Sequence, residues 1–413
     1  PDGYNVPQAE ALKRAVDVPV MVVGRIHDPE KAERILQAEK ADLIVMARPL
    51  LADPELPAKA ALRRFDDIRR CISCQNCIDS MFLWPVDSKM ACAVNAASGR
   101  ELRMRYEKAA TPRRIVVIGG GPGGMEAARV AAMRGHAVTL FEKRRRLGGS
   151  LTLAATVHAD NQRLLDWIVG QIRAQAIDIR LGATADIAAI GALRPDAVVV
   201  ATGARLALPD LPGIDLPHVL TGADLRRLAA GDPVDGTASL PRWLRFGVRH
   251  AGPVIDRHVT PGRIRRLADW WLPTGRRVAI VGDDLAAIEL AEFLARRGRD
   301  VAVLAEGELL APEIGPKRRL EHERRLEQLL VSINLAATPR RIVPAGVEIA
   351  LPHGKQSLVR ADTVIVAGAP VADTAFAESL SSLGVPVHAV GDCTGLGLIV
   401  KAVEEGATVA NAL

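Results

Sequence analysis

The sequence predicts an α/β fold in which parallel strands alternate with crossover helices. A short apolar strand, a glycine-rich turn and a helix follow one another at 114–133, and a related unit recurs at 276–306. Residues 1–60 contain two more apolar strands with a helix between them. Strands that alternate with helical segments are typical of parallel sheets. With 413 residues, the chain is long enough for two or three domains.

Composition and the distribution of apolar residues predict a soluble, cytoplasmic protein with no membrane partner. Hydrophobic residues make up 49% of the chain and charged residues 25%, which suffices for buried cores. Apolar runs such as "AVVVA" at 197–201 are far shorter than the roughly 18 residues that suggest a membrane span. The opening residues "PDGYNVPQAE" lack the basic and apolar regions of a signal peptide.

The net charge of +6 invites a nucleic-acid interpretation, which the arrangement of the charges does not support. Arginines are mixed with acidic residues throughout, as in "PKRRLEHERRLEQLL", where leucines recur at helical spacing. Solvated charge on an amphipathic helix accounts for that run. Aromatic residues make up 3% of the chain, too few for base stacking. We therefore expect no nucleic-acid partner.

Two βα units open the chain. The segment "VPVMVVGRI" reads as a buried strand, "DPEKAERILQAEK" as a helix capped by Asp28 with Pro29 at its first position, and "ADLIVMARPL" as a second strand. The strands end on Arg25 and Arg48, which suits a phosphate at the carboxyl ends of parallel strands. Exposed arginines that end strands by chance are the alternative. Two units cannot close a barrel, so they either extend another sheet or end a longer protein.

Four of the five cysteines, Cys71, Cys74, Cys77 and Cys92, lie between residues 71 and 92. Disulfides are uncommon in cytosolic proteins, so metal ligation is the better explanation. Zinc sites usually pair two C-x2-C knuckles across a spacer, whereas this run is C-x2-C-x2-C with one cysteine apart. That spacing favours a 4Fe–4S cluster over zinc. A cluster carries single electrons, so we expect redox centres on both sides of it.

The turn at 119–124 predicts a dinucleotide site. Gly119, Gly121 and Gly124 have G-x-G-x-x-G spacing between a strand and a helix. The next strand, "HAVTLFEK", carries Glu142 about 20 residues beyond the glycines, as the ribose-binding acid of such folds requires. Bare glycine backbone allows a pyrophosphate to approach the helix N-terminus, which favours its charge.

The second unit, "RRVAIVGDDLAAIELAEFLARRGRDVAVLAEGE", has a degenerate turn. Gly282 keeps the first position, but Asp284 and Ala287 replace the second and third glycines. A carboxylate repels a pyrophosphate unless it turns away. Weak NAD binding and a purely structural role both stay open. If a nicotinamide cofactor binds, Glu306 favours NADH, because a carboxylate repels the 2′-phosphate of NADPH.

Several motifs together resemble a known family. They are "GRIHDPEKAERIL", "ADLIVMARPLLADPELPAKA", "DDIRRCISCQNCIDS", "CAVNAASGRE" and "VVIGGGPGGMEAARVAAMRGH". The chain resembles the C-terminal portion of iron–sulfur flavoenzymes related to old yellow enzyme, the NADH:flavin oxidoreductase family. That group includes 2,4-dienoyl-CoA reductase, enoate reductases and trimethylamine dehydrogenase. In it, an FMN-bearing barrel precedes the cluster and an FAD or ADP domain, into which an NAD-type domain is inserted.

The resemblance implies a division of the chain and a set of cofactor ligands. The implied parts are the last two βα units of a (β/α)8 FMN barrel at 1–65, the cluster segment at 66–110, the FAD domain at 111–220 and 380–413, a connecting insertion at 221–275 and the NAD-type domain at 276–379. The implied ligands are Gly24, Arg25 and Arg48 for the FMN phosphate, the four cysteines for the cluster, Gly119, Gly121, Gly124, Glu142, Gly148, Gly149, Gly391 and Asp392 for FAD, and Gly282 and Glu306 for NADH. Cys393 is then a packing residue.

The resemblance also implies an activity. Electrons would pass from NADH through FAD and the cluster to FMN, which reduces an activated carbon–carbon double bond in a small-molecule substrate such as an enoyl-CoA. One alternative is an amine dehydrogenase whose electrons leave FMN through the cluster to an electron-transfer partner. Another is an electron-transfer subunit beside a separate barrel chain. Substrate-contacting residues would precede residue 1, so these residues alone should reduce no alkene. We expect a homo-oligomer.

The stretch "PRWLRFGVRHAGPVIDRHVTPGRIRRLADWWLP" connects the two nucleotide-type units. It carries Trp243, Trp270 and Trp271, which we expect to pack in a core or beneath a lid. The segment "MFLWP" before Cys92 makes the spacer longer than is usual in dienoyl-CoA reductases, so the subfamily stays open.

Overall fold

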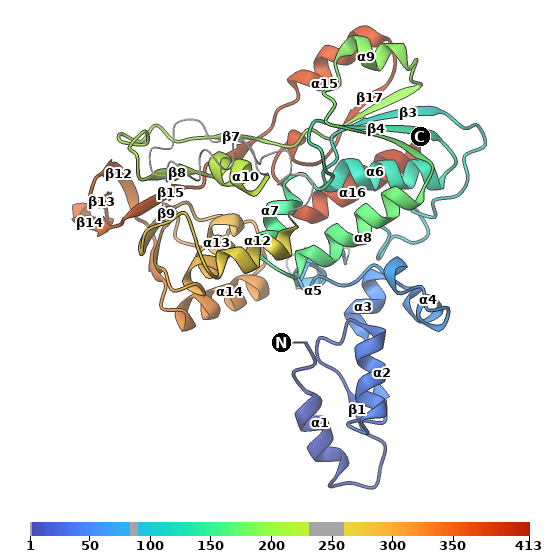
Figure 1. Ribbon diagram of the computed structural model, residues 1–413, viewed down its shortest axis with the longest axis horizontal. Helices are drawn as coiled ribbons and strands as arrows, with labels where there is room; N and C mark the ends of the chain where they lie inside the picture. The colour runs from blue at the N-terminus through green and yellow to red at the C-terminus, as the bar shows by residue number, and fades with distance from the viewer. Residues whose placement is uncertain (1, 83–89, 231–259) are drawn as a thin grey trace.

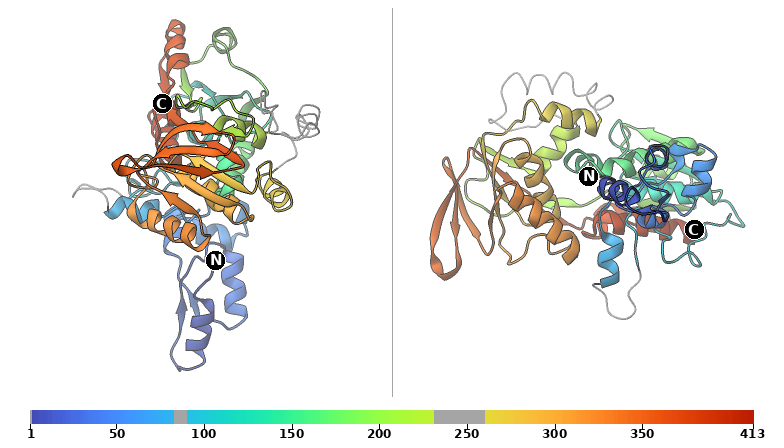
Figure 2. Two further views of the ribbon diagram at one scale, coloured as in Figure 1. Left: turned by 90° about the vertical axis from the view of Figure 1, so that its left-hand side faces the viewer. Right: turned by 90° about the horizontal axis from the view of Figure 1, so that it is seen from below.

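A computed structural model describes residues 2–82, 90–230 and 260–413. Figure 1 shows two large α/β bodies side by side, and both Figure 1 and the left view of Figure 2 show a small N-terminal unit that projects from them. The first body is built around strand β3 (Arg114–Ile118), and the second body around β9 (Arg277–Val281). Within the described ranges, no helix has the length and apolar character needed to cross a bilayer.

The N-terminal unit contains the predicted strand–helix–strand arrangement, with β1 and β2 paired in parallel. The predicted cap is confirmed, because the Asp28 side chain accepts from the backbone N–H of Glu30 and Pro29 begins the helix. The elements up to the cluster segment are α1 (Val6–Lys13), β1 (Met21–Val22), α2 (Pro29–Gln37), β2 (Leu43–Ile44), α3 (Ala47–Ala52), α4 (Leu56–Ala61), η1 (Phe65–Asp67) and α5 (Asn76–Phe82).

The predicted end of the second strand is wrong. Strand β2 stops at Ile44, and Arg48 lies in the first turn of α3 instead of at a strand terminus. Pro49, which follows Arg48, has no N–H to give to a sheet and has a φ angle suited to the start of a helix. The two arginines therefore do not end neighbouring strands.

One face of the two-stranded sheet is apolar and exposed. Val20 and Val22 are buried, whereas Met21 is 65% exposed and Val23 is 51% exposed. Alternate residues of a strand point to opposite faces, so this pattern marks one covered face and one bare face. A two-stranded sheet with a bare apolar face is at best marginally stable in water.

The first body has a five-stranded parallel sheet in the order β17-β6-β3-β4-β5. Its central strands β3 and β6 are β-branched and buried, as expected for a parallel sheet covered by helices on both faces. The remaining strands are β4 (Ala137–Glu142), β5 (Ile177–Leu181), β6 (Ala197–Val200) and β17 (Val387–Ala389). The helices are α6 (Pro122–Met133), α7 (Leu151–Val157), α8 (Asn161–Ala174), α9 (Ile187–Ala192), α15 (Ala375–Ser379) and α16 (Leu398–Ala412), with 3-10 turns η3 (Leu380–Leu383) and η4 (Gly391–Thr394).

The second body has its own five-stranded parallel sheet, in the order β11-β10-β9-β15-β8, and a three-stranded antiparallel sheet, β12-β13-β14. The strands are β8 (Val219–Thr221), β10 (Asp300–Leu304), β11 (Ser332–Asn334), β12 (Thr338–Val343), β13 (Gly346–Ala350), β14 (Gln356–Arg360) and β15 (Thr363–Val366). The helices are α10 (Gly222–Ala230), α12 (Pro261–Ala268), α13 (Leu285–Ala295) and α14 (Pro316–Gln328), with the 3-10 turn η2 (Pro352–Gly354).

The second body begins earlier than the expected boundary at residue 276, because β8 pairs with β15 in its sheet. Trp270, just beyond α12, is 92% exposed, so its expected packing role is wrong, and Trp243 lies outside the described residues, as does part of "MFLWP". The charged run at 316–328 is the predicted helix, with Leu326 buried. The helix ends at Gln328, and Leu330 beyond it is 89% exposed.

A short antiparallel pair connects the two bodies. The chain leaves the first body through β7 (Arg205–Ala207) and returns through β16 (Ala369–Val371), which pairs with β7. The strand β17 and helix α16 then complete the first body. The second body is therefore an insertion within the first, as the resemblance implied.

Helices α6 and α16 pack closely through glycines. A Cβ atom at Gly406 would lie 2.3 Å from the carbonyl oxygen of Gly123, and one at Gly123 would lie 3.1 Å from the carbonyl oxygen of Ala402. Neither contact leaves room for a larger side chain without a movement of backbone. The glycines thus fix the distance between α6 and α16.

We predict that Gly406→Ala lowers the free energy of unfolding by about 1–3 kcal/mol, because the added methyl group forces α16 away from α6. Equilibrium unfolding in urea measures the loss. The matched control is Gly170→Ala in α8, where the glycine is exposed and a Cβ atom meets nothing within 4 Å. That change should raise stability by up to about 1 kcal/mol. Equal stability of the two variants would contradict the close packing.

Candidate functional site

The first glycine turn joins β3 to α6 in a backbone conformation that requires glycine. Gly119 has φ +107°, and a Cβ atom there would lie 2.3 Å from the carbonyl oxygen of Ala201, just beyond the neighbouring strand β6. A Cβ atom at Gly124 would lie 1.9 Å from the carbonyl oxygen of Gly119. These two glycines are therefore needed for packing of the helix against the sheet.

Gly121 is different, because nothing in the protein occupies the space beside it. It is the N-cap residue of α6, with φ −77° and ψ −179°, and makes no side-chain cap. A Cβ atom at Gly121 would meet nothing within 4 Å. The residue lines a cavity of about 420 Å³, so the open space beside its backbone faces a possible ligand.

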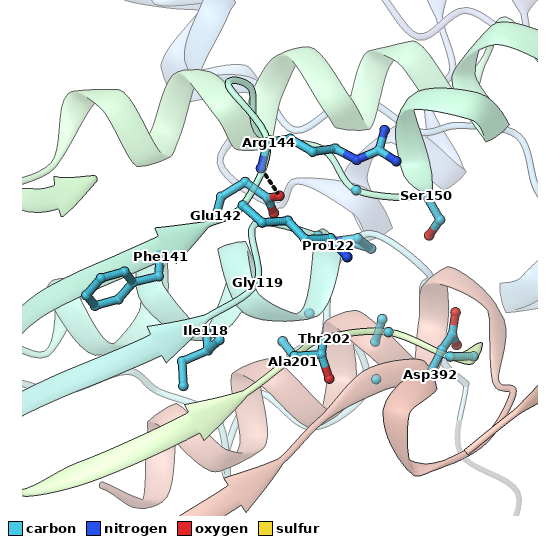
Figure 3. A pocket seen from close by; sticks show the side chains of 18 of the residues that line it. Ile118, Gly119, Pro122, Phe141, Glu142, Arg144, Ser150, Ala201, Thr202 and Asp392 are labelled. Atoms are coloured by element: carbon cyan, nitrogen blue, oxygen red, sulfur yellow. Dashed lines mark hydrogen bonds between the residues drawn. The ribbon is translucent and has the colours of Figure 1, made fainter. Parts of the chain in front are cut away.

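Glu142 lies at the end of β4, next to this turn (Figure 3). Its carboxylate accepts from the backbone N–H groups of Gly120 at 2.7 Å and Arg144 at 2.8 Å, and the residue is buried. These bonds hold the side chain at the rim of the cavity. A carboxylate has about four acceptor positions, so two remain for the hydroxyl groups of a ribose.

The loop at 146–149, with the sequence "RLGG", lies against the first glycine turn. The backbone N–H of Gly148 donates to the carbonyl oxygen of Gly120 at 2.8 Å. Gly148 and Gly149 have φ angles of +128° and +53°, and a Cβ atom at Gly149 would lie 2.9 Å from the Cα atom of Gly121. Backbone therefore surrounds the open space at Gly121 on two sides, in the form that a pyrophosphate requires.

Asp392 faces the same cavity from the opposite wall (Figure 3). Its Oδ1 atom is buried and has no hydrogen-bond partner, and burial raises the pKa of its carboxyl group. Gly391 is held by its N–H, which donates to Glu405 at 2.7 Å. An unpartnered buried oxygen in a cavity wall suits a ligand hydroxyl. Cys393 is fully buried, as expected of a packing residue.

These features fit FAD, the group that the sequence predicted for this cavity. The open backbone at Gly121, the acid at the end of β4 and the unpartnered Oδ1 atom of Asp392 lie around one space. Arg226 of α10 also lines it, and sequence reasoning missed this residue, because no motif marks an arginine on a distant helix.

The four predicted cluster ligands line one small cavity, together with Arg48 and Gln75. Burial raises the pKa of the Cys71 thiol to about 11 and that of the Cys92 thiol to about 12. Such thiols become thiolates only when a positive charge is supplied, as a metal does. In the described part of the chain, no three His, Cys, Asp or Glu side chains are close enough to bind one metal ion, so the cluster stays a prediction.

Helix α5, which carries Cys77, is attached to the second body. Asp79 Oδ1 accepts from the backbone N–H of Lys317 at 3.2 Å, in the first turn of α14. Gln75 Nε2 donates to Glu321 Oε1 on the same helix at 3.0 Å. The cysteine segment therefore lies between the N-terminal unit and both bodies.

The predicted FMN ligands are placed by contacts within the chain. Arg25 has φ +51°, and its guanidinium contacts Asp160 Oδ2 at 2.6 Å and Asp2 Oδ1 at 3.1 Å. Arg48 Nη1 donates to Gln75 Oε1 at 3.0 Å. Gly24 has φ +148° and lies against Asn5. Within the described residues no direct contact joins Arg25 to Arg48, but the charges of both lie near enough to His27 to add to the lowering of its pKa that burial causes.

The second glycine turn is closed by carboxylates. Gly282 keeps the left-handed φ of +141°, whereas Asp284 is the N-cap of α13 and accepts from the backbone N–H of Ala287 at 2.8 Å. Burial raises the pKa of Asp284 to about 6. Glu313 accepts from the backbone N–H of Leu285 at 2.6 Å. Glu306 is exposed beyond β10.

Another cavity, of about 230 Å³, lies where the cysteine segment and the two bodies meet, and we call it the junction cavity. Cys74 lines it from the cysteine segment, Pro122 and Asp392 from the first body, and Asp284 and Arg226 from the second body. Two residues predicted as ligands, Cys74 and Asp392, therefore share one space with Asp284 of the second glycine turn. Sequence reasoning missed this junction and Glu313, because both depend on segments that are far apart in the chain.

Comparison with known proteins agrees with this architecture. Residues 113–406 match the family described as pyridine nucleotide-disulphide oxidoreductase, and residues 3–67 match the NADH:flavin oxidoreductase / NADH oxidase family. An NADH oxidase of Thermoanaerobacter brockii is 31% identical over 413 residues, which are 99% of this chain and 57% of that protein. A cinnamate reductase of Clostridium sporogenes is 28% identical, over 88% of this chain and 49% of that protein.

Among solved structures, a 2-naphthoyl-CoA reductase in complex with 2-naphthoyl-CoA has a TM-score of 0.84 and 28% identity, over 100% of this chain and 57% of that protein. The chain spans about half the length of the relatives it matches. Both family names denote oxidoreductases that use a pyridine nucleotide. The chain therefore belongs to the pyridine nucleotide-disulphide oxidoreductase family over most of its length, preceded by a segment of the NADH:flavin oxidoreductase family.

Proposed function

We propose that this chain is the electron-transfer portion of an NADH-dependent flavin and iron–sulfur oxidoreductase that reduces an activated carbon–carbon double bond, as in an enoyl-CoA or an enoate. One observation carries the proposal. The cysteine segment, the first glycine turn and the second glycine turn all reach a single cavity, through Cys74, Pro122 and Asp284. The similarity to a cinnamate reductase and to a 2-naphthoyl-CoA reductase supports the type of reaction.

The first body would hold FAD, or at least its ADP half. Gly121 leaves its backbone open to the pyrophosphate, Glu142 would accept from the ribose, and Asp392 would receive a hydroxyl of the ribityl chain. Gly148 and Gly149 would add backbone beside the phosphates. The flavin, when bound, supplies the change from hydride to single-electron chemistry, and the protein supplies position and electrostatics.

The cysteine segment would hold a 4Fe–4S cluster through Cys71, Cys74, Cys77 and Cys92, whose shared cavity supports this assignment over four unrelated thiols. Arg48 lines that cavity as well, and its positive charge favours the thiolate form of Cys71. Cys71 and Cys74 precede α5, Cys77 lies in its first turn and Cys92 is remote in sequence, which is the spacing of ferredoxin-type sites.

An FMN site would be completed by residues outside this chain. Gly24, Arg25 and Arg48 are the proposed phosphate ligands, and Arg25 would first have to exchange its carboxylate partners for the phosphate. The bare apolar face at Met21 and Val23 suits further barrel strands. We place the substrate site in that barrel, which a longer chain or a second subunit would supply.

The proposed function is tested with a longer protein that includes a complete barrel. Under anaerobic conditions, NADH should bleach the flavin absorption, and an enone or enoyl-CoA should restore it with consumption of NADH. The 413 residues alone should accept electrons from NADH but reduce no alkene. Flavin reduction by a secondary amine, with no response to NADH, would instead support the amine dehydrogenase alternative.

Gly121→Val should empty the flavin site without unfolding the protein. The backbone at Gly121 is extended enough for any residue, so the valine adds no strain and only fills the ligand space. Flavin released by heat denaturation, measured per chain, should fall at least tenfold, and the urea midpoint of the flavin-free protein should not change. Gly170→Val, on an exposed helix surface, should keep its flavin. Normal flavin content in Gly121→Val would refute the site.

Purified protein should contain about four irons and about four acid-labile sulfides per chain. Cys74→Ser should lower both values, because serine is a poor ligand for iron in such clusters. Cys393→Ser is the matched control and should leave them unchanged, since Cys393 is buried against Val390 away from the other cysteines. Stoichiometric zinc without sulfide would end the cluster assignment.

A further inference from the structure

The two glycine turns of this chain differ in how their helices begin. Helix α6 begins at Gly121 with no side-chain cap. Helix α13 begins with two carboxylates, since Asp284 accepts from Ala287 at 2.8 Å and Glu313 accepts from Leu285 at 2.6 Å. In dinucleotide folds, the N–H groups of this first turn receive the pyrophosphate. In α13 they already have anionic partners from the same protein.

Glu313 is held in position by a loop that is part of the second body's core. Its neighbours Leu310, Ala311 and Ile314 are buried among the residues of α13 and β10. The backbone N–H of Ala311 also donates to the carbonyl oxygen of Asp283 at 2.5 Å. The loop backbone is therefore fixed beside the turn, and only the Glu313 side chain can leave Leu285 without disturbing the core.

The negative charge of Glu313 opposes pyrophosphate binding at α13, as its hydrogen bond from Leu285 also does. Glu313 lines the junction cavity beside Asp284, and its negative charge adds to the effect of burial in raising the pKa of Asp284. A pyrophosphate at the start of α13 would bring two more negative charges to this place. It would also need the N–H of Leu285, which can make only one strong hydrogen bond.

We infer that Glu313 is an internal competitor of the NADH pyrophosphate, and that NADH binds the second body only when the Glu313 carboxylate leaves the N-terminus of α13. The inference rests on the proposed function, in which NADH is the electron donor. Asp284, by contrast, can remain the cap of α13, because it accepts from the N–H of Ala287, two residues beyond Leu285. Glu313 therefore sets the affinity for NADH without touching the reacting atoms.

The test measures binding of NAD⁺ to the oxidised, flavin-loaded chain by calorimetry, so that no electron transfer interferes. Glu313→Ala should lower the dissociation constant about tenfold, which corresponds to about 1.4 kcal/mol. Glu313→Gln keeps the shape and an acceptor oxygen but removes the charge, so it should lower the constant by a smaller factor. Glu308→Ala, an exposed acid in the same loop, is the matched control and should bind as the unchanged chain does. Normal flavin content shows that each variant has folded.

The outcomes separate the inference from the proposed function. If the unchanged chain binds NAD⁺ and Glu313→Ala binds it equally well or more weakly, the inference is overturned while the proposed function stands. If the unchanged chain binds weakly or not at all and Glu313→Ala binds, the inference is supported. If no variant binds NAD⁺, including Asp284→Gly combined with Glu313→Ala, the inference and the choice of NADH as donor both fall.

Discussion

The first N–H groups of a helix need acceptors, and this requirement governs both nucleotide units of the chain. In the first body, Gly121 leaves them open toward a cavity whose walls include Glu142 and the unpartnered Oδ1 atom of Asp392. In the second body, Asp284 and Glu313 already satisfy them. Two units with the same order of strands and helices therefore offer very different surroundings to a dinucleotide.

The junction of the two bodies depends on the insertion through β7 and β16. Because β7 and β16 pair, both chain connections between the two bodies lie at one place. The turns before α6 and α13 reach the same cavity. The cysteine segment forms the third side of this cavity, where its residues Asp79 and Gln75 hydrogen-bond to Lys317 and Glu321 of α14. Single-electron transfer requires short distances between redox centres, and this junction would supply a common space for the proposed ones.

Much of this arrangement could be predicted from sequence, because it depends on local rules. The cap at Asp28, the glycine turn at 119–124 and the acid at Glu142 each follow from neighbouring residues. The structure confirms the cap and has the turn between β3 and α6 and the acid at the end of β4, whereas their binding of a dinucleotide stays a prediction. Arg48 was placed on a strand because its apolar neighbours read as one, although Pro49 favours a helix. Glu313 and Arg226 could not be predicted, since their roles arise only when distant segments meet.

The connection through β16 also fixes the order in which the first body can be completed during synthesis. Its edge strand β17, the Asp392 loop and helix α16 are translated after the whole second body. Until then the nascent first body lacks the helix that packs against Gly123, and the side of α6 that α16 covers stays bare. Domains usually fold in the order of their translation. Here the inserted body must emerge before the surrounding one can close, so capture of the proposed flavin would belong to the last stage of the chain's maturation.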